Sequence, residues 1–155
     1  MKRRIVTVLQ QYPWLVCESL QTVVAYAYAT AHRERAAYRW SVDVAVYVRQ
    51  EVQGQGIASA LYTHLFEILA LQGYRNVYAG ITLPNPPSLG LHKAMGFKEV
   101  GVYHRVGHKF GRWHDVAWFE RPLAKHISDP PEPVALPTLL LSEKTKAAIE
   151  SLLGH

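Results

Sequence analysis

The chain has 155 residues, and 49% of them are hydrophobic, which is enough for one compact core and argues against two ordinary domains. Lysine and arginine (17) outnumber aspartate and glutamate (12), and the formal net charge of +5 favours an acidic ligand. No basic run is longer than residues 2–4, so the charge pattern of a nucleic-acid-binding tail is missing. We therefore expect no nucleic-acid partner.

Cys17 is the only cysteine, which excludes an intrachain disulfide and a cluster of thiolate metal ligands. Such cysteine usage is typical of the reducing cytoplasm. The apolar run at residues 5–9 is shorter than the ~7–15 residues of an export signal, and no run approaches the ~20 residues of a membrane span. We expect a cytoplasmic protein without a membrane partner.

The first predicted elements are strands. Residues 14–28 are rich in valine, tyrosine and small residues with a polar break at residues 18–21, as in two antiparallel strands and their turn. After a polar connection, valines at positions 42, 44, 46 and 48 recur with a period of two, which places them on one face of a third strand. Asp43 and Tyr47 then share its opposite face.

Two helices and further strands follow. Apolar side chains recur at three- and four-residue intervals from Ile57 to Leu71, which predicts a helix of about four turns ending near Gly73. Residues 76–83 are typical of another strand, and the prolines after it open a short helix that Gly96 closes. Residues 97–123 predict two strands joined by a glycine-rich, basic loop.

The order of these elements predicts a mixed α/β (α+β) fold in which one crossover helix joins two parallel strands. The composition changes after residue 123. Residues 128–137 contain four prolines, which exclude a central strand or a helix, and a terminal helix capped by Ser142 follows. We expect one domain at residues 1–123 and a Pro-rich linker with a C-terminal helix at residues 124–155.

Gly54 and Gly56 stand between a predicted strand and a predicted helix. Glycine lets a ligand approach the backbone, and a helix N-terminus offers unpaired N–H groups to an anion. A P-loop is excluded because no lysine follows at the required place. The dinucleotide fingerprint is only half matched, because Ser59 replaces its third glycine and no acidic residue lies ~20 positions later. An ordinary surface loop remains an alternative to another kind of phosphate site.

A longer pattern narrows the choice. The segment QGQGIA at residues 53–58 fits [RQ]xxGx[GA] and resembles the pyrophosphate loop of the GNAT superfamily of N-acetyltransferases. Further segments resemble the phosphinothricin N-acetyltransferase branch, and together they cover about residues 11–123. These segments are YPWLV, RAAYRW, VYV, LYTHL, LPN, LHKAMGF and GRWHDV.

The resemblance implies a splayed GNAT-type sheet and transfer of an acetyl group from acetyl-CoA to the amine of a small amino-acid-like acceptor, by direct attack. Phosphinothricin and methionine sulfoximine are acceptors of this type. It also implies a set of residues that bind acetyl-CoA. These are Val46, Tyr47, Val48, Gly54, Gln55, Gly56, Ile57, Ala58, Ser59 and Asn85.

The same resemblance implies roles in catalysis. Asp43 stands where the family has a glutamate proposed as general base, and the shorter aspartate would act through a water. Alternatively, Asp43 satisfies a turn or pairs with Arg35. His92 stands where the family protonates the coenzyme thiolate, the alternative being a helix histidine that bonds a backbone carbonyl. Arg35 and Tyr38 would bind the acceptor.

We expect no metal site, because the glycine between the two histidines of HRVGH argues against one rigid helical face, and no Cys or Glu completes a ligand set with them or with WHD. The family's habit implies a homodimer. Only eleven residues precede YPWLV, where the family usually has a strand and two helices. The N-terminal residues with the C-terminal extension, or a second subunit, would then fill the gap. The competing hypothesis is a catalytically weak acyl-CoA-binding or regulatory protein on the same fold.

Overall fold

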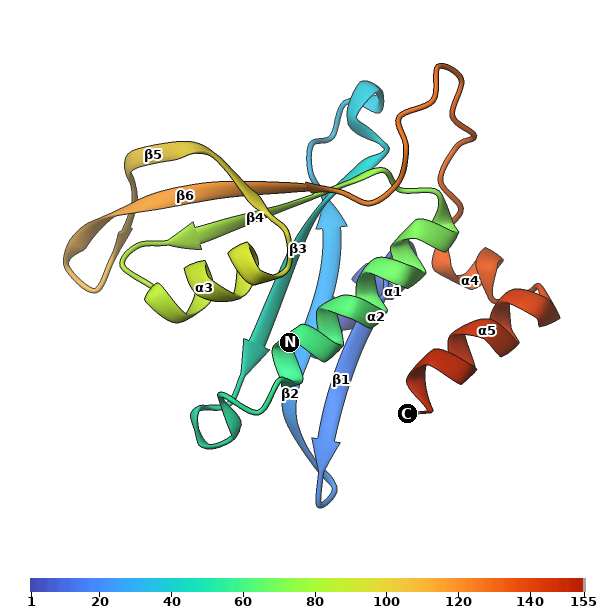
Figure 1. Cartoon of the computed structure of the whole chain (residues 1–155), viewed down its shortest axis with the longest axis horizontal. Helices are drawn as coiled ribbons and strands as arrows, with labels where there is room; N and C mark the ends of the chain where they lie inside the picture. Colours follow the sequence, from blue (N-terminus) through green and yellow to red (C-terminus); the bar gives the residue numbers. More distant parts are fainter. Residues whose placement is uncertain (155) are drawn as a thin grey trace.

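The computed structural model describes residues 1–154, which form one mixed sheet with helices on both faces (Figure 1). The strands are β1 (Trp14–Ser19), β2 (Thr22–Ala31), β3 (Ser41–Val48), β4 (Asn76–Thr82), β5 (Lys98–Lys109) and β6 (Arg112–Pro122). The α-helices are α1 (Lys2–Leu9), α2 (Ile57–Gln72), α3 (Pro86–Ala94), α4 (Leu136–Leu139) and α5 (Glu143–Leu153), and the 3-10 turns are η1 (Ala36–Tyr38) and η2 (Gln50–Val52). The predicted mixed fold is confirmed.

The sheet opens between its two parallel strands. Its strand order is β1-β2-β3-β4-β6-β5, and α2 is the crossover from β3 to β4. Those two strands pair only along Ser41 to Asp43, although β3 continues to Val48. Beyond that point β2 stays paired with β3 and β6 stays paired with β4, so the sheet diverges like the arms of a V (Figure 1). The opening positions the candidate site.

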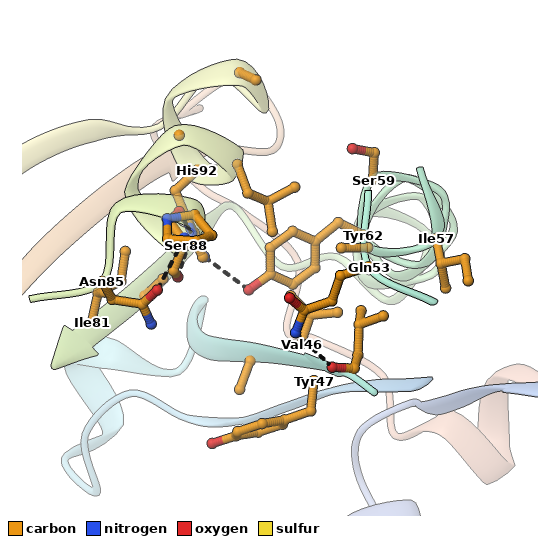
Figure 2. Close-up of a pocket in the computed structure, with 18 of the residues that line it drawn as sticks. Val46, Tyr47, Gln53, Ile57, Ser59, Tyr62, Ile81, Asn85, Ser88 and His92 are labelled. Carbon is orange, nitrogen blue, oxygen red and sulfur yellow. Dashed lines mark hydrogen bonds between the residues drawn. The ribbon is translucent and has the colours of Figure 1, made fainter. Parts of the chain in front are cut away.

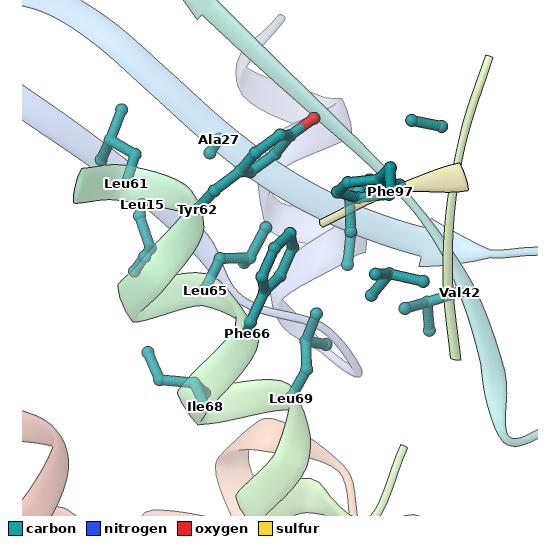
Figure 3. Packing of buried hydrophobic residues seen from close by; sticks show 14 of the residues in the cluster. Leu15, Ala27, Val42, Leu61, Tyr62, Leu65, Phe66, Ile68, Leu69 and Phe97 are labelled. Atoms are coloured by element: carbon teal, nitrogen blue, oxygen red, sulfur yellow. The ribbon is translucent and has the colours of Figure 1, made fainter. Parts of the chain in front are cut away.

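The core lies between α2 and the sheet. Leu65, Ile68 and Leu69 of α2 are almost completely buried against sheet residues such as Ala27 and Val42 (Figure 3). Each aliphatic side chain removed from water contributes roughly 1.5–3 kcal/mol. The periodicity that predicted this helix is therefore the packing face of α2. The core side chains of β2 and β3 point toward α2, so their alternate residues point to the other face of the sheet.

The hairpin of β5 and β6 differs from the prediction. The expected glycine-rich loop is strand almost to its end, and the turn consists of Phe110 and Gly111. Both residues have left-handed φ, 53° and 70°, as a two-residue turn with the twist of a hairpin requires. The basic residues therefore lie along the strands of an extended arm.

Both ends of the chain pack onto the domain. Residues 2–9 form α1, and Arg4 donates a hydrogen bond of 2.7 Å to the hydroxyl of Tyr28. The C-terminal segment crosses the end of α2, where the buried amide of Gln72 donates to the carbonyls of Gln11 (2.8 Å) and Val134 (2.9 Å). Ser142 caps α5 as predicted, whereas the expectation of no helix in residues 128–137 is wrong at its end, because α4 begins at Leu136 and a proline is tolerated in the first turn of a helix. No helix within residues 1–154 is both long enough and apolar enough to cross a membrane.

Candidate active site

A cavity of about 830 Å³ occupies the opening between β3 and β4, with α2 and α3 as its other walls (Figure 2). Gln55 is the one residue of the predicted coenzyme set that does not line it. The predicted residues that do line it are Val46, Tyr47, Val48, Gly54, Gly56, Ile57, Ala58, Ser59, Asn85 and His92. The structure thus brings together segments that lie far apart in the sequence.

One wall of this cavity is a free strand edge. From Val44 to Val48, β3 pairs with β2 on one side only, because β4 has already diverged. Backbone groups of a strand alternate between its two edges, so half of the groups here face the cavity rather than a neighbouring strand. The carbonyl of Val48 accepts a hydrogen bond of 3.1 Å from the Gln53 side chain. The remaining edge offers hydrogen bonds to an extended ligand.

The second wall is the start of α2. Gly54 and Gly56 have left-handed φ of 77° and 78°, and Gly56 is the N-cap. The first bond of the helix runs from the Ala60 N–H to the Gly56 carbonyl, so the N–H groups of residues 57–59 have no partner inside the helix. No acidic side chain lies in the first turn. The free N–H groups and the helix dipole together make the N-terminus of α2 a candidate anion-binding site.

A hydrogen-bonded chain of three residues joins α2 to α3 across the cavity (Figure 2). Nδ1 of His92 lies 2.7 Å from the carbonyl oxygen of Ser88, which can only accept, so Nδ1 carries the hydrogen. Nε2 is then the acceptor for the Tyr62 hydroxyl at 3.0 Å. Burial lowers the pKa of His92 and raises that of Tyr62. The pair is therefore a neutral imidazole and a protonated phenol at neutral pH.

Tyr62 was not predicted as a site residue. It is fully buried, and its ring reaches from α2 toward His92 (Figure 2). In the sequence it is one aromatic residue among the apolar residues of a helix, so no local signal separates it from the core. Only the position of α3 shows that its hydroxyl meets a histidine.

A smaller cavity of about 230 Å³ contains Asp43. It lies on the face of the sheet opposite α2, because Asp43 alternates with the core residues Val42 and Val44. The two cavities share Val44, Ala45 and Gly80 as a common wall. The other residues around the smaller cavity are Tyr28, Thr30, Val116 and Trp118. Asp43 and His92 therefore belong to different cavities on the two sides of one strand.

Asp43 is paired with His32, a residue that sequence reasoning missed. Nδ1 of His32 lies 2.5 Å from Oδ1 of Asp43, so Arg35 is not its partner. Burial raises the pKa of the Asp43 carboxyl, and the hydrogen bond from His32 opposes this rise. The signal is absent from the sequence because His32 stands in a polar connection. Only the register of β2 against β3 brings the two residues together.

Arg35 and Tyr38 flank or form η1 and line neither of the two cavities. Both are exposed, Tyr38 by 47%. Among the histidines of the β5–β6 arm, His104 lies 3.5 Å from an Asp115 oxygen, and Nε2 of His114 lies 3.1 Å from the Lys109 carbonyl. Within residues 1–154, no three His, Cys, Asp or Glu side chains are grouped so that they could hold a metal ion.

The chain is similar to known acetyltransferases. A phosphinothricin N-acetyltransferase of Streptomyces viridochromogenes is 43% identical over 124 residues, which are 80% of this chain and 67% of that protein. An L-methionine sulfoximine/L-methionine sulfone acetyltransferase of Pseudomonas aeruginosa is 35% identical over 122 residues, 78% of this chain and 71% of that protein. The chain spans between 53% and 71% of the length of these and other curated relatives.

A solved structure agrees with these relatives. The crystal structure of a GNAT superfamily phosphinothricin acetyltransferase from Sinorhizobium meliloti in complex with acetyl-CoA has a TM-score of 0.79 and 36% identity, over 89% of this chain and 76% of that one. The family model described as Acetyltransferase (GNAT) domain matches residues 1–118. The chain therefore belongs to the GNAT acetyltransferase family.

Proposed function

We propose that the chain transfers an acetyl group from acetyl-CoA to the amine of a small amino-acid acceptor of the phosphinothricin or methionine sulfoximine type. The main observation behind this proposal is the larger cavity, which contains an anion-binding site at the start of α2 and the free edge of β3. This cavity adjoins the smaller cavity that contains the Asp43 carboxylate. The names of the relatives support the acceptor class.

The residues around the larger cavity fit acetyl-CoA. When bound, acetyl-CoA supplies the thioester carbonyl and the leaving thiolate. The N–H groups of residues 57–59 suit its pyrophosphate, and the free edge of β3 suits the pantetheine amides. Oδ1 of Asn85 accepts the Ser88 N–H as the cap of α3, which leaves the amide nitrogen of Asn85 to donate to the pantetheine arm.

Asp43 is our proposed general base. An acceptor in the smaller cavity presents its ammonium group to this carboxylate, which takes one proton directly or through a water. The neutral amine would then attack the thioester carbon where the two cavities adjoin; the C–N bond forms and the C–S bond breaks to release the thiolate. The proposal that Arg35 and Tyr38 bind the acceptor rests on resemblance alone, because neither lines the smaller cavity.

His92 and Tyr62 are our proposed source of the proton for the leaving thiolate. The Nδ1 hydrogen of His92 is held by the Ser88 carbonyl, whereas the Tyr62 hydroxyl can rotate away from Nε2 of His92 and donate its proton to the thiolate, so that its O–H bond breaks and an S–H bond forms. His92 orients this hydroxyl and, through Nε2, can return a proton to the phenolate oxygen once it has taken one up from solvent.

The proposed function is tested with the purified chain. Titration calorimetry measures the binding of acetyl-CoA, and a thiol-release assay measures turnover with methionine sulfoximine, phosphinothricin and, as a control, their N-acetylated forms. We expect acetyl-CoA to bind, and we expect thiol release with the free amines but not with their N-acetylated forms. Binding without thiol release would favour the second candidate, a coenzyme-binding regulatory protein, and absence of binding would contradict both.

Finer features of the protein are also proposals. We propose that residues 1–123 form the catalytic domain and that residues 124–155 support it through the contacts of Gln72 and α5. The lone cysteine supports a cytoplasmic location. Exposed apolar side chains on the β5–β6 arm support a homodimer, which sedimentation would detect as twice the chain mass. They are Val100, Tyr103, Val106, Phe110 and Trp113.

A further inference from the structure

We propose that His32 is a positioning residue for Asp43: its Nδ1–H holds one carboxylate oxygen, so that Asp43 remains an ionised base facing the smaller cavity. This inference rests on the proposed function, because Asp43 needs to be a base only if the chain transfers acetyl groups to amines. It assigns a role to a histidine that the resemblance left without one.

The geometry fixes the imidazole firmly. His32 follows β2 directly, and its backbone N–H donates to the Ser41 carbonyl at 3.4 Å. The ring stacks on Tyr78 of β4, with centroids 4.2 Å apart and planes at 18°. Its other neighbour is Trp118 of β6, at 6.3 Å and nearly perpendicular. Two aromatic rings on two strands thus hold the imidazole against the carboxylate.

The hydrogen bond determines the tautomer. An ionised carboxylate can only accept, so Nδ1 carries the hydrogen in the bond of 2.5 Å to Asp43. Nε2 has no hydrogen-bond partner within residues 1–154, and it is not among their fully buried unpaired atoms, so water can reach it. The ring therefore presents its Nδ1 hydrogen to Asp43, and its side chain is only 17% exposed.

The proposed proton transfer balances. An N–H bond of the acceptor ammonium breaks, its electron pair stays on nitrogen, and an O–H bond forms at the Asp43 oxygen that His32 does not hold. The proton then passes to water, which restores the carboxylate. His32 keeps its Nδ1 hydrogen throughout, so it acts on the reaction only through Asp43.

The surrounding charges set the direction of the pH effect. The groups around Asp43 are His32 at the end of β2, Arg33 beside it, Tyr28 of β2, Tyr78 of β4 and the uncharged Trp118 of β6. Burial raises the pKa of Asp43, whereas His32 and, more weakly, Arg33 lower it. Burial also raises the pKa of both tyrosines, which therefore stay neutral. Without His32, the carboxyl would remain protonated to a higher pH.

Two substitutions separate the hydrogen bond from the packing. His32→Phe keeps an aromatic ring between Tyr78 and Trp118 but has no donor. His32→Asn places an amide N–H close to the position of Nδ1. We expect the acidic limb of the pH profile of kcat/KM to move up by about one unit in His32→Phe, a tenfold loss on that limb that higher pH recovers. In His32→Asn the limb should lie near that of the unmodified chain, and the KM for acetyl-CoA should change in neither variant.

An acidic limb at the same pH in His32→Phe would overturn the proposal, as would a loss of rate that is equal at every pH. A carboxyl carbon NMR titration of Asp43 gives a readout that needs no turnover. Its midpoint should rise in His32→Phe and stay in His32→Asn, and an unchanged midpoint would also overturn the proposal. If the unmodified chain fails to acetylate any acceptor while the Asp43 midpoint responds as expected, the proposed function falls and the pairing stands.

Discussion

At the scale of single residues, the start of α2 depends on a backbone conformation that only glycine adopts easily. Gly56 has a φ of 78°, and an added Cβ would meet no atom within 4 Å. The cost of Gly56→Ala is therefore conformational, about 1–2 kcal/mol. A backbone rotation at residue 56 would relieve part of this cost, and it would also redirect the N–H groups of the anion-binding site at the start of α2.

We expect Gly56→Ala to weaken acetyl-CoA binding at least about tenfold, measured by titration calorimetry. Gly107→Ala is the matched control, because Gly107 also has open space around it but no left-handed φ. Equal affinities in the two variants would show that the N–H groups of α2 do not hold the coenzyme.

The hydroxyl of Tyr62 has a predicted effect on rate. Tyr62→Phe removes the proposed proton donor and should lower kcat by about 10²-fold or more. It also leaves Nε2 of buried His92 without a partner, at a cost of about 1–3 kcal/mol in stability. Tyr74→Phe is the control: it loses the hydroxyl that accepts a hydrogen bond from Gln11, and Tyr74 lines neither cavity. If both variants turned over equally fast, Tyr62 would have no role in proton transfer.

At the scale of secondary-structure elements, Gln72 connects the end of α2 to two other parts of the chain. Its side-chain amide nitrogen donates to the backbone carbonyls of Gln11 and Val134, and its backbone carbonyl accepts the Val134 N–H at 2.8 Å. The side chain is 1% exposed, so water cannot replace these bonds.

Gln72→Ala should therefore lower the free energy of unfolding by about 2–4 kcal/mol, measured by urea denaturation. The exposed Gln10→Ala serves as the control and should change it by less than about 0.5 kcal/mol. We also expect faster proteolytic cleavage of the C-terminal segment in the Gln72 variant. A stability equal to that of the control would mean that the C-terminal segment is held by other contacts.

The elements differ in how far the sequence predicts them. The period of β3 and the apolar spacing of α2 are local patterns, and both elements were predicted with nearly correct bounds. The path of the C-terminal segment has no local signal, because it depends on contacts between residues far apart in the sequence, such as those of Gln72 with Val134 and of Trp40 with Pro131. The site divides in the same way. Glycines at a strand–helix junction can be recognised locally, whereas the partners His32 and Tyr62 are defined only by strand register and helix placement.

At the scale of the whole molecule, the buried His92 couples stability to pH. Burial lowers its pKa in the folded state below the ordinary value of ~6.5, so the unfolded chain binds more protons as pH falls. The contribution of His92 is present in full above pH ~6.5 and is lost as the pH falls through the folded-state pKa. The contribution of Asp43 to stability changes with pH in the opposite direction. Burial raises the pKa of its carboxyl, so its contribution is lost as the pH rises, in a more acidic range than that of His92.

We expect the melting temperature to fall between pH 7.5 and pH 5.5, and to fall less in His92→Gln, which cannot titrate. Thermal unfolding at several pH values measures both slopes. The variant begins from a lower melting temperature, so the comparison concerns slopes only. Parallel slopes in the two proteins would show that His92 is not the group that titrates.

The divergence of β3 from β4 has a consequence for the order of events in turnover. The larger cavity opens on the side of α2 and α3, and the smaller one opens on the other face of the sheet. Acetyl-CoA and the acceptor would enter through the separate openings of these two cavities. Neither would block the other, so both can be bound at the same time. Double-reciprocal plots of initial rate against acetyl-CoA concentration, measured at several fixed acceptor concentrations, should therefore give intersecting lines. This is the pattern of a ternary complex that acetyl-CoA and the acceptor can enter in either order. Parallel lines would instead indicate a ping-pong mechanism, in which the protein is acetylated first and CoA leaves before the acceptor binds.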